Sequence, residues 1–272
     1  MEKCFEVLSM VDRPTIGSAS DRTTNDKALQ LVTARLTPHS KVLDLGAGRG
    51  HLARRVAAWF EEQGKSPSDH IFATDLAANG FEASEVPFTE IDLNEVLPFP
   101  AEAFDLIYSI EVFEHLRRPY DVLKECYGTL KPGGYLIVST PNILHLRSRL
   151  RFFFTGFYEL YQPPSIDPRN AGRLCGHIMP LHIAYYAYGL RSVGFVEVQY
   201  VRDKTKKGSM ALYVLLYPIL AFVRWRFLHD IRKYDVAVFN ENRQVLSIAN
   251  SKQLLTSRSL MFVAQKPDHK LG

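Results

Sequence analysis

The sequence has few cysteines, and none of them is arranged as a zinc ligand would be. Cys4, Cys126 and Cys175 are scattered, with no CxxC pair and no zinc-type Cys/His spacing. An odd, dispersed set argues against a disulfide framework and predicts reduced thiols in a cytoplasmic protein. The first residues also lack an apolar run and a small-residue cleavage site, so we expect no secretion signal.

The chain also lacks internal repeats and a strong excess of one charge. Its formal net charge is +4, which is too small to indicate nucleic acid as a partner. The positive charge is unevenly distributed, with nine basic and three acidic residues between positions 191 and 233. The apolar share of 46% and the charged share of 23% exclude a disordered or collagen-like chain and predict a globular protein.

From residue 41 onward, short apolar runs alternate with helical patterns. The expected strands are 41–46, 70–75, 85–92, 104–110, 135–140, 195–201 and 259–266, and the expected helices are 51–63, 119–130 and 180–192. Continuous apolar strands alternating with helices predict a parallel sheet covered on both faces. We expect one domain over 1–272, divided into a 1–40 helix or lid, a 41–140 cofactor-binding core, a 141–194 acceptor-side insertion and a 195–272 segment with an apolar insertion at 204–233.

A glycine-rich loop, Asp44 to Gly50, joins the first strand to the first helix of that core. Such a loop approaches a ligand closely, and the helix beginning near His51 offers unpaired N–H groups there. Asp75, Asp92 and Glu111 follow the ends of the next three strands, the edge where open α/β sheets bind ligands. The spacing is GxGxG, and Asp75 lies 29 residues after Gly46 rather than about 20. The pattern therefore favours an adenosyl group without a pyrophosphate over NAD and a dehydrogenase.

Five stretches resemble, in family order, the class I S-adenosylmethionine-dependent methyltransferases: VLDLGAGRG (42–50), ATDL (73–76), EIDLNE (90–95), FDLIYSIEVFEHL (104–116) and LKPGGYLIVSTPN (130–142). The resemblance implies a three-layer, Rossmann-like α/β fold, with seven strands, the last antiparallel, and inserted helices after strands five and six. It implies S-adenosylmethionine as cofactor and a lid near Ile16–Asn25. The implied cofactor-binding residues are Asp44, Gly46, Ala47, Gly48, Gly50, Asp75, Leu76, Asp92, Leu93, Asn94, Ser109, Glu111 and Val112.

The segment EVFEHL (111–116) bears on the acceptor. It is most similar to the signature of ubiquinone-biosynthesis O-methyltransferases, and it also resembles small-RNA 2′-O-methyltransferases that hold a divalent metal with two glutamates and two histidines. By that second resemblance Glu111, Glu114, His115 and His177 are candidate metal ligands, and Glu111 and His115 could share one face of a helical turn. The alternative without metal makes His115 a general base or substrate-orienting residue, with Glu111 as its catalytic partner. The (Asn/Asp)-Pro-Pro-aromatic motif of enzymes that methylate base or amide nitrogen is absent.

An apolar run at 210–223 is flanked by basic residues on both sides. Fourteen residues are too few to cross a membrane, and Pro218 interrupts them. We therefore expect a buried helix, a dimer-interface helix, or an interfacial helix on an anionic membrane. A second basic-aromatic segment consists of Arg147, Arg149 and Arg151 followed by Phe152–Phe154. Stacking of these side chains on single-stranded RNA is a further interpretation.

Together these patterns predict a cytoplasmic methyltransferase, peripheral at the inner membrane face, that modifies an oxygen of an amphiphilic or lipid-linked small molecule. A quinone precursor or a glycan is the expected acceptor, and nucleic acid is not an expected partner. Two alternatives stay open, a metal-dependent RNA 2′-O-methyltransferase and a non-catalytic binding protein with the methyltransferase fold.

Overall fold

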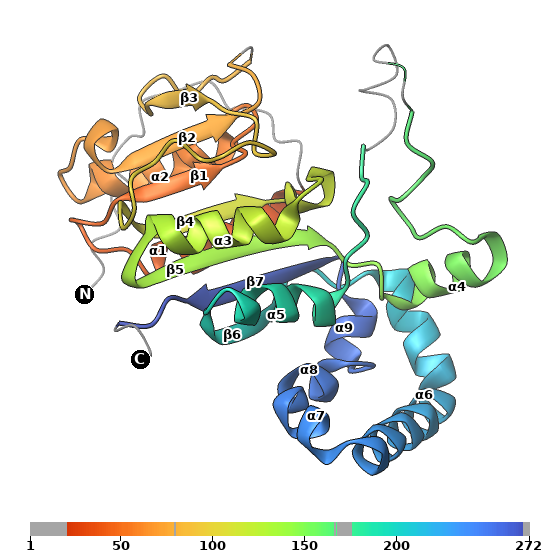
Figure 1. The fold of residues 1–272 in the computed structure, drawn as a ribbon. Helices are drawn as coiled ribbons and strands as arrows, with labels where there is room; N and C mark the ends of the chain where they lie inside the picture. Colours follow the sequence, from red (N-terminus) through yellow and green to blue (C-terminus); the bar gives the residue numbers. More distant parts are fainter. Residues whose placement is uncertain (1–20, 79, 166, 168–175, 269–272) are drawn as a thin grey trace, which may run out of the picture.

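The computed structural model describes residues 21–78, 80–165, 167 and 176–268, and a seven-stranded sheet forms its centre (Figure 1). The strands are β1 (Val42–Leu45), β2 (Ile71–Asp75), β3 (Phe88–Glu90), β4 (Phe104–Ile110), β5 (Leu130–Pro141), β6 (Val196–Arg202) and β7 (Ser259–Gln265). Their order is β3-β2-β1-β4-β5-β7-β6. Strands β1 to β5 pair in parallel, and β7 runs antiparallel to both β5 and β6. This confirms the predicted fold class.

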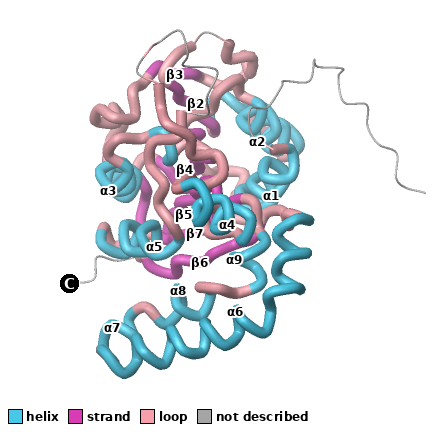
Figure 2. The backbone as a smooth tube through the Cα atoms, turned by 90° about the vertical axis from the view of Figure 1, so that its right-hand side faces the viewer, coloured by secondary structure: helices cyan, strands magenta, loops and turns pink. Residues whose placement is uncertain are grey.

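Helices cover both faces of the sheet, as the continuous apolar strands predicted (Figure 2). On one face α1 (Arg22–Thr33) and α2 (His51–Glu62) pack with Val42 and Ile71 of the sheet. On the other, α3 (Pro119–Thr129) and α5 (Ile183–Ser192) pack with Leu43. Successive residues of β1 thus enter opposite cores, because side chains alternate across a strand.

Strand β5 is longer than the sequence indicated. Residues Lys131–Gly134, which precede the expected strand 135–140, lie inside it, where the pairing with β4 shifts from Phe104↔Leu130 to Leu106↔Tyr135. A short 3-10 turn, η1 (Pro67–Asp69), precedes β2. Strand β3 is confined to three residues of the expected 85–92 run.

The insertions leave the sheet at its β5–β7–β6 end. Helix α4 (Leu146–Thr155) follows β5, while α6 (Lys207–Tyr234), α7 (Val236–Glu241), α8 (Arg243–Ile248) and α9 (Lys252–Thr256) form an arch between β6 and β7 (Figure 1). Helix α6 has 28 residues and continues through Pro218, so the expected interruption is wrong. Proline removes one helical N–H and leaves the carbonyl of Val214 without its helical donor. Because Val214 is exposed, water can reach this backbone.

The buried-helix interpretation of 210–223 is also wrong. No residue in the most apolar 18-residue stretch of α6 is buried. Among the described residues of this helix, only Ser209 is fully buried. By length and composition α6 could cross a membrane.

Candidate functional site

A cavity of about 450 Å³ opens at the carboxyl ends of β1, β2 and β4. This volume is in the ordinary range for small-molecule sites. All of the predicted cofactor-binding residues line it except Gly50 and Ser109: Asp44, Gly46, Ala47, Gly48, Asp75, Leu76, Asp92, Leu93, Asn94, Glu111 and Val112. The parallel register places these ends together, with Leu45 beside Thr74 and Asp75 beside Glu90.

The glycine loop turns tightly at the mouth of β1. Gly46, Gly48 and Gly50 have φ angles of 86°, 55° and 85°, the left-handed region that favours glycine. A Cβ on Gly46 would lie 2.5 Å from a methyl of Val112, whereas one on Gly48 would meet no atom within 4 Å. Gly50 allows close packing instead, because a Cβ there would lie 2.8 Å from Phe81 and 2.9 Å from Ala83, neither of which lines the cavity.

Asp75 lies at the cavity edge with its carboxylate fixed by the backbone. Gly48 N donates to Asp75 Oδ2 at 2.7 Å, and Leu76 N donates to Oδ1 at 2.7 Å. Each oxygen retains accepting capacity for a ligand hydroxyl. Asp92 is held in a similar way, since the backbone and side-chain nitrogens of Asn94 both donate to its Oδ1 and lower the pKa of its carboxyl group.

Asp44 is a buried carboxyl group beneath the glycine loop. Burial raises its pKa to about 8, against a donated hydrogen bond from the hydroxyl of Tyr108 at 2.9 Å, and the neighbouring charge of Asp75 raises it further. Asp44 thus holds a proton at neutral pH until a cation comes near. Ser109, on β4, is fully buried and donates to Leu45 O at 2.7 Å, so it joins the strands beneath the cavity.

Glu111 and His115 do not share one face of a helical turn, and that expectation is wrong. Glu111 has a positive φ of 58°, and the short 3-10 turn η2 begins at Phe113 and ends at His115. The left-handed residue turns the Glu111 side chain toward β5, where Ser139 Oγ donates to Oε1 at 3.1 Å. A guanidinium nitrogen of Arg258 lies 3.9 Å from Oε2.

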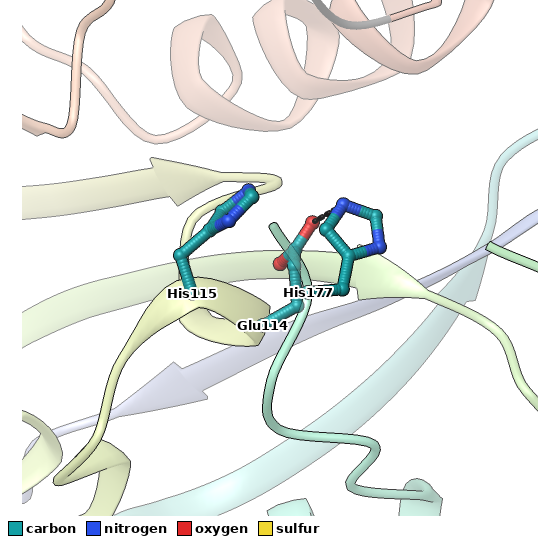
Figure 3. Close-up of side chains that lie close together, drawn as sticks. All are labelled: Glu114, His115 and His177. Atoms are coloured by element: carbon teal, nitrogen blue, oxygen red, sulfur yellow. Dashed lines mark ion pairs between the residues drawn. The ribbon is translucent and has the colours of Figure 1, made fainter. Parts of the chain in front are cut away.

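Glu114, His115 and His177 come together instead, the first two from η2 and His177 from the segment before α5 (Figure 3). One ligand atom from each lies within 4.8 Å of the others, and among the described residues this group does not include Glu111. His115 Nδ1 lies 3.1 Å from the carbonyl of Gly176, which leaves Nε2 for a ligand. Burial, and next the charge of His115, lower the pKa of His177 to about 4, so His177 is neutral at physiological pH.

Glu114 is completely buried, and neither of its carboxylate oxygens has a hydrogen-bond partner within the described chain. Nε2 of His177 lies 3.9 Å from Oε1, which is too far for a hydrogen bond (Figure 3). The Nδ1 atom of His177 is likewise without a partner there. Unpaired buried polar atoms cost free energy, and such a set is usually satisfied by an ion or by water. The arrangement therefore fits a divalent cation with nitrogen and oxygen ligands.

The sequence reasoning missed several contributors to this site. The cavity is also lined by Asn25, Arg49, His51, Leu52, Ile91, Ile110, His115 and Leu116, of which only His115 and the lid residue Asn25 had been singled out. The remaining expected lid, 16–20, lies outside the described residues, as do Cys4 and Cys175. Arg258 gave no signal in the sequence, because it lies far along the chain and reaches Glu111 through the antiparallel return of β7.

Comparison with known proteins gives consistent results for the fold and for the core. Residues 43–138 match the family model for the methyltransferase domain. The chain is 26% identical over 188 residues to a ubiquinone biosynthesis O-methyltransferase of Acinetobacter baumannii, covering 62% of this chain and 78% of that one. It is 31% identical over 182 residues to an erythromycin 3''-O-methyltransferase of Saccharopolyspora erythraea, covering 62% of this chain and 56% of that one.

Two further curated relatives are matched over only 32% and 54% of their own lengths. Among solved structures, a S-adenosylmethionine-dependent methyltransferase from Archaeoglobus fulgidus superposes with a TM-score of 0.55 at 18% identity, covering 90% of this chain and 95% of that one. This likeness shows that the fold extends beyond the matched core to the last strands.

Proposed function

Because the chain is a class I S-adenosylmethionine-dependent methyltransferase, we propose that it methylates a hydroxyl oxygen of an amphiphilic or lipid-linked small molecule. A quinone precursor or a glycan is the acceptor class we favour. The relatives named for ubiquinone biosynthesis and for erythromycin are O-methyltransferases, which supports an oxygen acceptor. The proposal rests mainly on the position of His115. This histidine lines the cavity, and its Nε2 is available because Nδ1 contacts the carbonyl of Gly176.

Bound S-adenosylmethionine would supply a methyl group on a positively charged sulfur. In our proposal Asp75 binds the ribose hydroxyls, Asp92 and Leu93 border the adenine, and the glycine loop surrounds the methionine part. His115 then accepts the hydroxyl proton, because its Nδ1 is engaged with the Gly176 carbonyl and its Nε2 is free to receive one. Holding the acceptor in line with the methyl group supplies much of the remaining acceleration.

A metal-dependent variant of this chemistry is the second candidate, favoured by the unpaired oxygens of Glu114. Glu114, His115 and His177 would hold a divalent cation, which would lower the pKa of a hydroxyl bound to it. Those three residues are also where an RNA 2′-O-methyltransferase activity would have to be centred.

The experiment is methyl transfer by the purified full chain from radiolabelled S-adenosylmethionine to polyprenyl catechols, lipid-linked sugars and a short RNA. We expect labelling of a hydroxyl-bearing amphiphile and none of RNA. His115→Gln should reduce the rate by roughly 10²–10⁴-fold while calorimetry gives the parent's cofactor affinity. Labelling of no hydroxyl acceptor, or an unchanged rate in His115→Gln, contradicts the proposal.

Chelation separates the two candidates. If His115 acts alone, EDTA leaves the rate unchanged, and Glu114→Gln, which is isosteric and replaces the carboxyl group by an amide, lowers it much less than His115→Gln does. If a cation is required, EDTA abolishes transfer, added Mn²⁺ or Zn²⁺ restores it, and Glu114→Gln is as inactive as His115→Gln. Cofactor binding without transfer to any acceptor would instead favour a non-catalytic binding protein.

A further inference from the structure

Helix α6 presents an apolar surface that the described part of the chain leaves uncovered. Its half-buried side chains, Tyr213, Leu216, Leu220, Arg224 and Leu228, recur every three or four residues. They form the face turned toward the rest of the arch, where Arg224 donates to Ser247 O at 2.7 Å. On the other side several large apolar residues are exposed, among them Val214, Leu215, Ile219, Phe222 and Trp225, with Arg226 beside them. Leu215 is 74% exposed and Phe222 is 63% exposed.

The charge of α6 is positive and concentrated toward its end. The helix contains five basic residues, Lys207, Arg224, Arg226, Arg232 and Lys233, against one acid, Asp230, which pairs with Arg226 at 3.1 Å. An apolar face beside a net charge of +4 (five minus one) is complementary to an anionic lipid surface. A second copy is less complementary to this surface, because its α6 carries the same net charge of +4.

Both ends of α6 are fastened to the same side of the molecule. At its start Lys206 N donates to Thr256 O at 2.7 Å, and Thr205 bridges to Ser257 beside β7. After its end, α8 returns to the sheet, where Gln244 Nε2 donates to Val198 O of β6 at 2.8 Å. Arg191 of α5 also donates to the carbonyl of Glu241 and to the side chain of Gln244. A helix that crossed a bilayer would place these two ends on opposite sides, so α6 cannot cross while this fold is intact.

We propose that α6 binds flat to an anionic membrane, with the Val214–Trp225 face inserted among the headgroups and upper acyl chains. Helix α4 extends the same contact, since its Phe153 and Phe154 are 79% and 77% exposed. The two helices are joined, because Lys206 pairs with Glu159 at 2.6 Å and Ser209 Oγ lies 3.2 Å from His145 Nδ1. This inference rests on the proposed function, because membrane binding would bring the enzyme to a lipid-linked acceptor. Its test is separate, because vesicle binding is measured without methyl transfer.

Co-sedimentation of the full chain with vesicles tests the surface. We expect binding to phosphatidylcholine vesicles containing phosphatidylglycerol, weaker binding as salt is raised, and little binding to phosphatidylcholine alone. The double variant Leu215→Glu with Phe222→Glu should bind at least tenfold more weakly. Val96→Glu is the matched control, because Val96 is 75% exposed and lies before β4, away from α6, and it should bind as the parent does.

Calorimetry with S-adenosylmethionine shows whether each variant is folded, and it keeps a failure of the membrane proposal distinct from a failure of the methyltransferase proposal. A double variant with normal cofactor binding and undiminished vesicle binding overturns the role of α6. A parent that binds no vesicles but forms a dimer that this double variant dissociates overturns it in favour of a second copy.

The flat orientation has its own test. Lys207→Cys and Tyr234→Cys, introduced one at a time, mark the two ends of α6. Cys4 and Cys175 are replaced by serine in both variants, and Cys126 is kept because it is buried. A membrane-impermeant maleimide added outside vesicles already carrying the protein should label both ends. Protection of either end until detergent is added would show a crossing helix and overturn the in-plane arrangement.

Discussion

Asp44 makes the stability of the protein depend on pH in an unusual direction. Its pKa is about 8 in the folded state and about 3.9 in an unfolded chain, so between these values only the folded state holds the proton. Stability contributed by this group is therefore lost as pH rises, by at most about 1.4 kcal/mol per pH unit. Asp44→Asn keeps an acceptor for the Tyr108 hydroxyl and should remove this decline.

Urea unfolding at pH 5 to 8 measures the effect. The free-energy difference between Asp44→Asn and the parent should grow with pH. Asp92→Asn is the control, because the lowered pKa of that exposed carboxyl places its titration below this range. Parallel pH profiles for Asp44→Asn and the parent would show that the Asp44 carboxyl titrates normally.

Substitution by alanine should reduce the stability of the protein more at Gly46 than at Gly48. Both have positive φ, so alanine strains the backbone at each, by roughly 1–2 kcal/mol. Only at Gly46 does the methyl also collide with Val112. We expect Gly46→Ala to have a clearly lower melting temperature than Gly48→Ala, while Gly48→Val remains folded and blocks the cavity. Equal melting temperatures of the two alanine variants would mean that Val112 moves aside without cost.

At the scale of elements, the junction between α4 and α6 predicts loss of stability in acid. His145 is buried there between Lys206 and Glu159, and burial, followed by the charge of Lys206, lowers its pKa to about 4. An unfolded histidine has a pKa near 6.5, so between pH 6.5 and 4 only the unfolded state gains the proton. Stability from this group is therefore complete above pH 6.5 and falls as pH drops toward 4.

His145→Gln should reduce the acid-side loss, by up to about 1.4 kcal/mol per pH unit. Chemical denaturation at pH 4.5, 5.5 and 6.5 gives the comparison, with His39→Gln, a histidine substitution at an exposed position, as the control. A variant at position 145 that loses stability as steeply as the parent would show that other buried histidines dominate.

The elements were predictable where local pattern and tertiary packing agree. The ranges of β4, α3 and α5 were close because each apolar run is buried against the sheet that the pattern implied. Glu111 was misplaced because helical spacing cannot reveal a left-handed residue that is not glycine. The length of helix α6 was underestimated because charged residues interrupt the apolar sequence from Arg224 onward, so the continuous apolar run ended before the helix did.

In the candidate site, too, the residues set by local sequence pattern were predictable, and those set by tertiary contacts alone were not. Asp75 and the glycine loop were found because strand ends and loop spacing are local features. The resemblance to the metal-dependent enzymes had already placed His177 with Glu114, although sixty-three residues separate them. The approach of Arg258 to Glu111 had no such motif behind it, and only the folded chain brings these two residues together. Gly50 and Ser109 were found by their motif positions, but neither lines the cavity. Gly50 allows close packing against Phe81 and Ala83, and Ser109 donates a hydrogen bond to the carbonyl of Leu45.

For the whole molecule, cofactor binding should raise the melting temperature. Ligand at one hundred times its dissociation constant stabilises the folded state by about 2.7 kcal/mol, which for a chain of this size is roughly 5–10 °C. S-adenosylmethionine and its demethylated product should give this shift, and NAD should give none. Asp75→Ala should weaken cofactor affinity by roughly 1–3 kcal/mol and shrink the shift. A shift with NAD alone would indicate a dehydrogenase.

The position of β7 determines when the sheet can be completed as the chain is synthesised. β7 lies between β5 and β6 in the sheet. The edge of β5 that faces away from β4 therefore has no strand partner until residues 259–265 have left the ribosome. By then α6 has already emerged, with its apolar face exposed to solvent. A nascent chain halted before Ser259 therefore presents an open strand edge and an uncovered apolar helix together, the combination that chaperones recognise and that drives aggregation.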